Sequence, residues 1–179
     1  MNKAGLINFL ENWENMSLLF NDPEQARRYF PLLMEITLTG KEKVSWRAAW
    51  AADKINTRIP GIAAPWIKEM LAALPETKDK GKKRQYLKFI SLYPIPEHAE
   101  GFLFEYCLEK LMSETEDVSV RVWSMQILYN ISESQPELKE ELLQIIEQEM
   151  EYRPTPGIIA RGRKLSALLR KEILKRNKV

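Results

Sequence analysis

The side chains that most enzymes use for catalysis are scarce in this sequence. His98 is its only histidine and Cys107 its only cysteine. A multi-histidine metal site therefore has too few ligands, and we expect His98, in the first turn of a predicted helix, to be a surface imidazole. Cys107 lies among Phe104, Leu108 and Leu111, which predicts a buried structural thiol rather than a nucleophile. The sequence thus predicts no catalytic residue, no metal site and no cofactor.

Two tryptophans and a carboxylate form the most distinctive local pattern. Trp46, Trp50 and Asp53 lie three or four residues apart in a predicted helix, so they share one face. Aromatic rings beside basic residues suit a nucleic acid or a peptide partner. The same spacing is also typical of a helix that buries two large rings in the core. Both interpretations stay open at the level of sequence.

Arginines recur at a nearly constant interval. Arg47, Arg84 and Arg121 are each 37 residues apart, and Arg163 follows 42 residues later. The first three stand near the start of a segment with helical periodicity. Recurrence at this interval is typical of helical repeat arrays, in which each hairpin of helices buries its apolar face against the next.

The elements that must position these residues are helices. Strand signals are almost absent, since no Asn-Gly or Asp-Gly hairpin turn occurs. Asp22, Ser134 and Thr155 are expected to act as N-caps, two of them directly before a proline. Breakers such as Gly40 and the Pro60-Gly61 pair separate the segments. The sequence predicts nine helices, over residues 3–20, 23–39, 44–58, 62–74, 80–93, 96–113, 118–132, 135–151 and 156–177.

Two neighbouring segments indicate how these helices pair. Nine of the fourteen residues from 118 to 131 are apolar, so that helix needs neighbours on most sides. The next segment carries one apolar stripe with glutamates off it, which predicts a solvent-exposed face. An inner helix paired with an amphipathic outer helix is the unit of an α-solenoid.

Two stretches carry a family resemblance. Residues 115–131, TEDVSVRVWSMQILYNI, resemble the start of the second helix of a HEAT repeat, and residues 43–50, KVSWRAAW, resemble another. The chain as a whole resembles a small HEAT or armadillo-like protein. This resemblance implies an all-α fold, a right-handed α-α superhelix of about nine helices, in a single domain over residues 1–179. It also implies that Asp117 and the arginines at 47, 84 and 121 bond between adjacent repeats, with ligand binding as their alternative role.

One group of enzymes shares this architecture. DNA alkylation repair glycosylases are built from HEAT-like repeats and use aromatic residues, an aspartate and bases on a concave surface. Trp46, Trp50 and Asp53 match these residue types, although the formal net charge of +2 is small for a DNA-binding protein. A nucleic-acid-binding or glycosylase-like protein is therefore kept as the alternative function.

Charge is unevenly distributed along the chain. Residues 161–179 hold eight bases against Glu172, whereas residues 133–151 hold seven glutamates and one lysine. Arg161, Arg163 and Lys164 precede an apolar stripe, so we expect the last helix to cap the array with its bases in solvent. Binding of an acidic partner or a nucleic acid is the alternative role for these three bases.

We predict a non-enzymatic scaffold that presents a concave groove to a protein or peptide. The first residues lack the long apolar run of a signal peptide, and no stretch is long enough to span a membrane, so a cytoplasmic monomer or weak dimer is expected. The candidate partner-binding residues are Trp46, Arg47, Trp50, Asp53, Arg84, Arg121, Arg161, Arg163 and Lys164.

Overall fold

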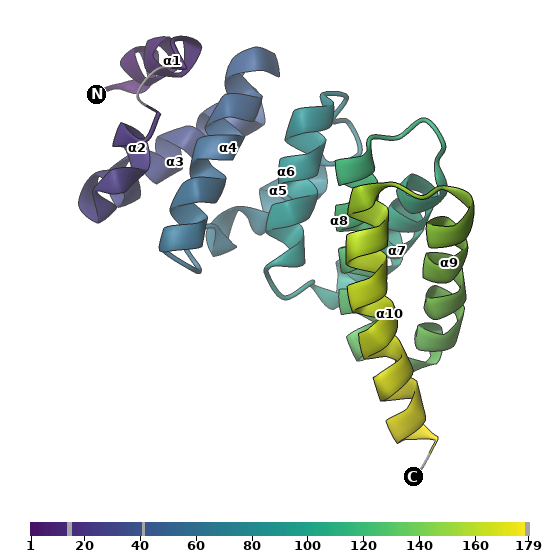
Figure 1. Cartoon of the computed structure of the whole chain (residues 1–179). Coiled ribbons are helices and arrows are strands. Elements are labelled where there is room, and N and C mark those ends of the chain that lie inside the picture. Colours follow the sequence, from purple (N-terminus) through teal and green to yellow (C-terminus); the bar gives the residue numbers. More distant parts are fainter. Residues whose placement is uncertain (14–15, 41, 178–179) are drawn as a thin grey trace. The chain divides into compact units, whose positions relative to one another are not determined.

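A computed structural model describes residues 1–13, 16–40 and 42–177 of the chain. These residues form ten α-helices, two short 3₁₀ helices and no strand (Figure 1). The predicted all-α fold class is confirmed. The chain divides into two compact units, residues 1–93 and residues 94–179. A single domain over residues 1–179, and the hand of its superhelix, stay predictions.

The first unit contains two helical hairpins and a short N-terminal pair of helices. The hairpins are α3/α4 and α5/α6, and their second helices, α4 and α6, pack against each other. Of the N-terminal pair, α1 packs on α4, and α2 packs on α3 and α4. The elements of this unit are α1 (Lys3–Glu11), α2 (Leu18–Asn21), α3 (Pro23–Thr39), α4 (Glu42–Arg58), the 3₁₀ helix η1 (Ala64–Trp66), α5 (Ile67–Ala73) and α6 (Lys80–Ser91).

The second unit repeats the same arrangement. Its hairpins are α7/α8 and α9/α10, and the second helices α8 and α10 pack side by side. The apolar helix α8 contacts α7, α9 and α10, as its sequence pattern predicts. The elements of this unit are α7 (Glu97–Met112), α8 (Val118–Ser134), the 3₁₀ helix η2 (Pro136–Leu138), α9 (Lys139–Tyr152) and α10 (Pro156–Arg176).

The structural repeat is 38 residues long. The second helices α4, α6, α8 and α10 begin at residues 42, 80, 118 and 156, which are three equal steps. The 37-residue interval of the arginines therefore slips by one residue in each repeat. One residue turns a helix by about 100°, so Arg47, Arg84 and Arg121 point in different directions from their helices.

Burial follows the 38-residue step closely. Residues that lie 38 positions apart, or a multiple of 38, occupy equivalent places in the second helices. Three sets of equivalent residues are buried in all four second helices: Ala48, Tyr86, Ser124 and Gly162; Ala51, Phe89, Ile127 and Leu165; Ala52, Ile90, Leu128 and Ser166.

The continuous helix predicted over residues 3–20 is wrong. Instead α1 ends at Glu11 and α2 begins at Leu18, and residues 14–15 of that segment lie outside the described ones. Trp13 follows α1, and its ring lies 5.3 Å from the ring of Trp46 and 5.1 Å from that of Trp50. Packing on α4 thus outweighs local helix propensity.

Residues 178–179 of the basic C-terminal stretch also lie outside the described part.

Two of the three predicted N-caps are confirmed. The Asp22 carboxylate accepts a hydrogen bond from the Glu24 amide at 2.9 Å, and the Thr155 hydroxyl accepts one from the Ile158 amide at 3.3 Å. The cap predicted at Ser134 is wrong, because this residue ends α8. Its hydroxyl donates to the Ile131 carbonyl at 2.9 Å, a bond that serine makes readily within a helix.

The turn after α4 requires glycine, and this requirement gives a stability test. Gly61 has a φ of 93°, a conformation that costs other residues about 1 kcal/mol or more. Gly61→Ala should lower the urea midpoint of unfolding, measured by circular dichroism. Gly101→Ala is the matched control: Gly101 lies within α7 with open space at the Cβ position, so alanine should raise the midpoint. Equal effects of the two substitutions would contradict this assignment of the turn.

Candidate functional site

An aromatic cluster lies on α4 in the first unit. The ring of Trp13 lies against those of Trp46 and Trp50, each pair inclined by 45°. Phe20, from α2, meets Trp50 edge-on at 5.9 Å. The α4 aromatic cluster, defined as these four residues, therefore brings together three separate segments. Trp13 is 39% exposed and the other three are half-buried, so the cluster is neither core nor fully open surface.

Two arginines of α4 hold the N-terminal helices in place. The Arg47 guanidinium donates to the carbonyls of Leu10 and Glu11, at 2.9 and 2.7 Å, where α1 ends. Arg58 donates to the carbonyl of Phe20, in α2, and its Cζ lies 4.9 Å from the centre of that ring. Arg47 likewise lies 4.9 Å from the Trp13 ring. Each arginine thus binds helix-end carbonyls and an aromatic face together.

Around the cluster, the exposed side of α4 is basic. Lys43 and Lys54 are exposed, and the Lys54 ammonium lies 5.3 Å from the centre of the Trp50 ring. We call the exposed and half-buried residues of this side the α4 stripe. Its members are Lys43, Trp46, Arg47, Trp50, Lys54, Thr57 and Arg58. The described side chains of this stripe include four bases and no carboxylate.

Asp53 does not join the tryptophans at the surface. It is 3% exposed, and one carboxylate oxygen accepts a hydrogen bond from the Lys88 ammonium of α6 at 2.6 Å. The Asp53 carboxylate therefore points toward α6 and does not form a surface group with the two rings, a question that the sequence left open. Arg84, also on α6, is half-buried.

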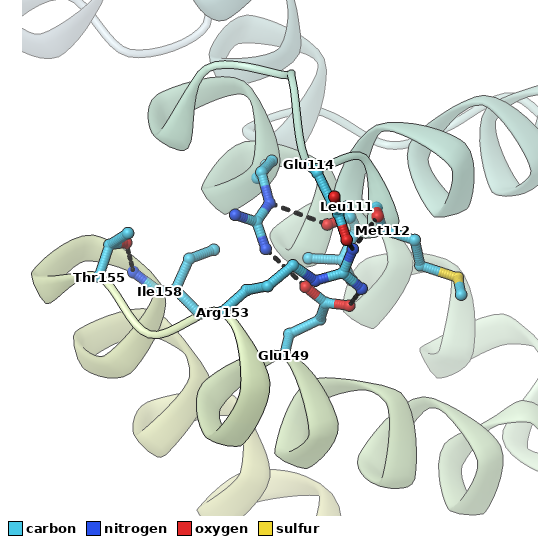
Figure 2. Close-up of polar contacts among 8 residues, drawn as sticks. Leu111, Met112, Glu114, Glu149, Arg153, Thr155 and Ile158 are labelled. Atoms are coloured by element: carbon cyan, nitrogen blue, oxygen red, sulfur yellow. Dashed lines mark hydrogen bonds and ion pairs between the residues drawn. The ribbon is translucent and has the colours of Figure 1, made fainter.

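Arg121 is part of a buried ion-pair network in the second unit. It is 5% exposed, donates to the Leu111 carbonyl at 2.9 Å and pairs with Glu149 of α9 at 2.5 Å. Figure 2 shows the Glu149 carboxylate also bonded to Arg153, which in turn reaches the Met112 carbonyl. Arg121 therefore links the α7/α8 hairpin to the α9/α10 hairpin and is not available to a partner. Arg121 thus bonds between adjacent hairpins, whereas the carboxylate of Asp117 accepts hydrogen bonds from Ser119 at the start of its own helix.

The three bases predicted on the last helix have different surroundings. The Arg161 guanidinium lies 4.8 Å from the centre of the Trp123 ring and donates to the Gln126 side chain. Burial lowers the pKa of Arg161. Arg163 and Lys164 are exposed.

Comparison with known families decides the classification. A family model described as a HEAT repeat domain matches residues 12–168. The chain belongs to the HEAT repeat domain family. No match was found among curated proteins or among solved structures. In this HEAT repeat domain each second helix begins 38 residues after the previous one, and this regular step is what the family's repeated hairpins require.

The single histidine and the single cysteine of the HEAT repeat domain sequence differ in their surroundings. His98 is exposed, as predicted, and Cys107 is fully buried, where burial raises the pKa of its thiol to about 12. Within the described ranges, no group of three histidine, cysteine or acidic side chains is placed to hold a metal ion. None of the described helices is long and apolar enough to cross a membrane.

Several residues of the α4 stripe and of the α4 aromatic cluster were not predicted from the sequence. Lys43, Lys54 and Arg58 were identifiable, because they continue the helical spacing of Trp46 and Trp50. Trp13 and Phe20 come from other segments, and no spacing in the sequence relates them to α4.

The buried Arg121–Glu149 pair of the HEAT repeat domain predicts that a single and a double substitution reduce the free energy of unfolding by different amounts. Glu149→Leu leaves the guanidinium of Arg121 buried without its carboxylate, which should reduce the free energy of unfolding by about 3–5 kcal/mol. Arg121→Met combined with Glu149→Leu removes both charges and should cost less than Glu149→Leu alone. Urea unfolding of Arg121→Met, of Glu149→Leu and of the double variant measures this difference. A double variant that loses as much stability as the two single losses added together would contradict the network.

Proposed function

We propose that this HEAT repeat domain is a non-enzymatic scaffold that binds a protein or peptide partner on the α4 stripe. The observation that carries the proposal is the half-exposed state of the α4 aromatic cluster. Large rings held rigidly at a surface are typical of the residues that dominate binding energy in protein interfaces. Scaffolding by repeated helical hairpins is also the common use of this family's architecture.

Support for a binding surface, beyond a structural role, comes from what the two arginines leave exposed. Arg47 and Arg58 bind carbonyls and ring faces, which fixes the rings and still leaves Trp13 39% exposed. Such a preorganised surface loses little side-chain entropy when a partner binds. We expect the protein to act in the cytoplasm, as a monomer or a weak dimer.

Base excision is the less supported alternative. A glycosylase of the kind considered above would need a carboxylate beside its aromatic residues at the surface. Asp53 is buried and paired with Lys88, so it does not meet this need. We therefore do not extend the proposal to DNA repair.

A site-directed crosslinking experiment tests the proposal. A photoreactive amino acid placed at Thr57, an exposed member of the α4 stripe, should crosslink a partner from cell extract. Trp50→Ala should abolish that product, because the ring contributes a large share of the interface. The same photoreactive group at Glu105, exposed on α7, is the matched control and should not yield the product. Identical products from both positions, or a product that persists in Trp50→Ala, would contradict the proposal.

A further inference from the structure

The bases on the exposed side of α4 fall into two sets with different surroundings. Arg47 and Arg58 are bonded to carbonyls of α1 and α2. Lys43 and Lys54 are exposed, and the contact found for Lys54 is with the Trp50 ring rather than with a carboxylate. The carboxylate of Asp53, on the same helix, is buried and bonded to Lys88. The two exposed lysines thus give this side of α4 a positive charge.

We propose that the partner of the α4 stripe is an acidic peptide segment. This inference rests on the proposed function and adds the chemistry of the partner. Carboxylates of the segment pair with Lys43 and Lys54, and an apolar side chain between them packs on the exposed part of Trp13. Charge complementarity of this kind sets the specificity of an interface and the rate at which the partners associate.

The spacing of the two lysines indicates the spacing of the carboxylates. Lys43 and Lys54 are eleven residues apart in one helix, which corresponds to about 16 Å along its axis. An extended peptide covers this distance in about five residues. Two acidic positions about five residues apart, with an apolar residue between them, therefore suit the α4 stripe.

The contacts of the aromatic rings favour a peptide partner over a single-stranded nucleic acid. Bases bind such proteins by stacking on open aromatic faces. Here Arg47 lies over the Trp13 ring, while the Trp50 ring contacts Trp13, Phe20 and Lys54. Arg47 and these neighbours thus occupy ring surface that a base would need for stacking. The exposed part of Trp13 suits an apolar side chain, and the ammonium groups of Lys43 and Lys54 suit carboxylates.

Fluorescence anisotropy with three labelled probes tests the inference. The first probe is a peptide with two Glu pairs about five residues apart around a leucine. The second has Gln in place of every Glu, and the third is an oligothymidylate of the same length. We expect the Glu peptide to bind about tenfold or more tightly than the Gln peptide, and to weaken as salt is added.

A matched pair of variants locates the site. Lys43→Glu with Lys54→Glu should weaken binding of the Glu peptide by about tenfold or more. Arg163→Glu with Lys164→Glu changes the charge equally at exposed positions of α10 and should leave binding within about twofold. All four substitutions are at exposed side chains, where effects on stability are small.

The other possible results of these binding measurements contradict different parts of the inference. Equal binding of the Glu and Gln peptides, lost in the α4 variant, overturns the acidic partner but supports peptide binding on the α4 stripe. Tighter binding of the oligothymidylate, lost in the same variant, overturns the inference in favour of a nucleic acid. Equal losses in both variants, or no binding of any probe, overturn it as well. The crosslinking at Thr57 is independent of the probes, so failure of the inference and failure of the proposed function remain distinguishable.

Discussion

Backbone carbonyls at the ends of helices place the main constraint on this fold. The last carbonyls of an α-helix have no partner within that helix and need one from elsewhere. Bases on the second helices supply several of them: Arg47 binds the end of α1, Lys82 the end of α3, and Arg121 the end of α7. Each bond also places a cation at the negative end of a helix. Neighbouring helices are therefore held by long basic side chains as well as by apolar contact.

Because of these bases, α4 can hold its neighbouring helices and also present the surface that we propose for a partner. Guanidinium groups suit the structural part, since they are planar, carry several donors and can lie on a ring while they bind carbonyls. Arg47 and Arg58 do both. The lysines of α4 remain exposed beside the rings that these arginines fix. The surface that we propose for a partner is thus a consequence of how α1 and α2 are attached.

The helices were predictable from the sequence because their start signals are local. Asp22 and Thr155 form the expected caps, and α3 has the predicted bounds. The arginines gave an interval one residue shorter than the structural repeat, because Arg47 and Arg121 bind carbonyls at the end of an earlier helix from different positions of their own helices. Trp46 and Trp50 were identified as a shared face, but the burial of Asp53 depends on where α6 lies. The position of Trp13 depends on a chain reversal, and local sequence patterns carry no information about that contact.

Native-state hydrogen exchange of Arg47→Met tests the central claim most directly, because methionine keeps the apolar stem and removes the donors. If Arg47 supplies the partner of the last carbonyls of α1, the amides of residues 3–11 should exchange markedly faster than in the unaltered protein, while those of α7 to α10 keep their protection. Unchanged protection of α1 in this variant would contradict the account.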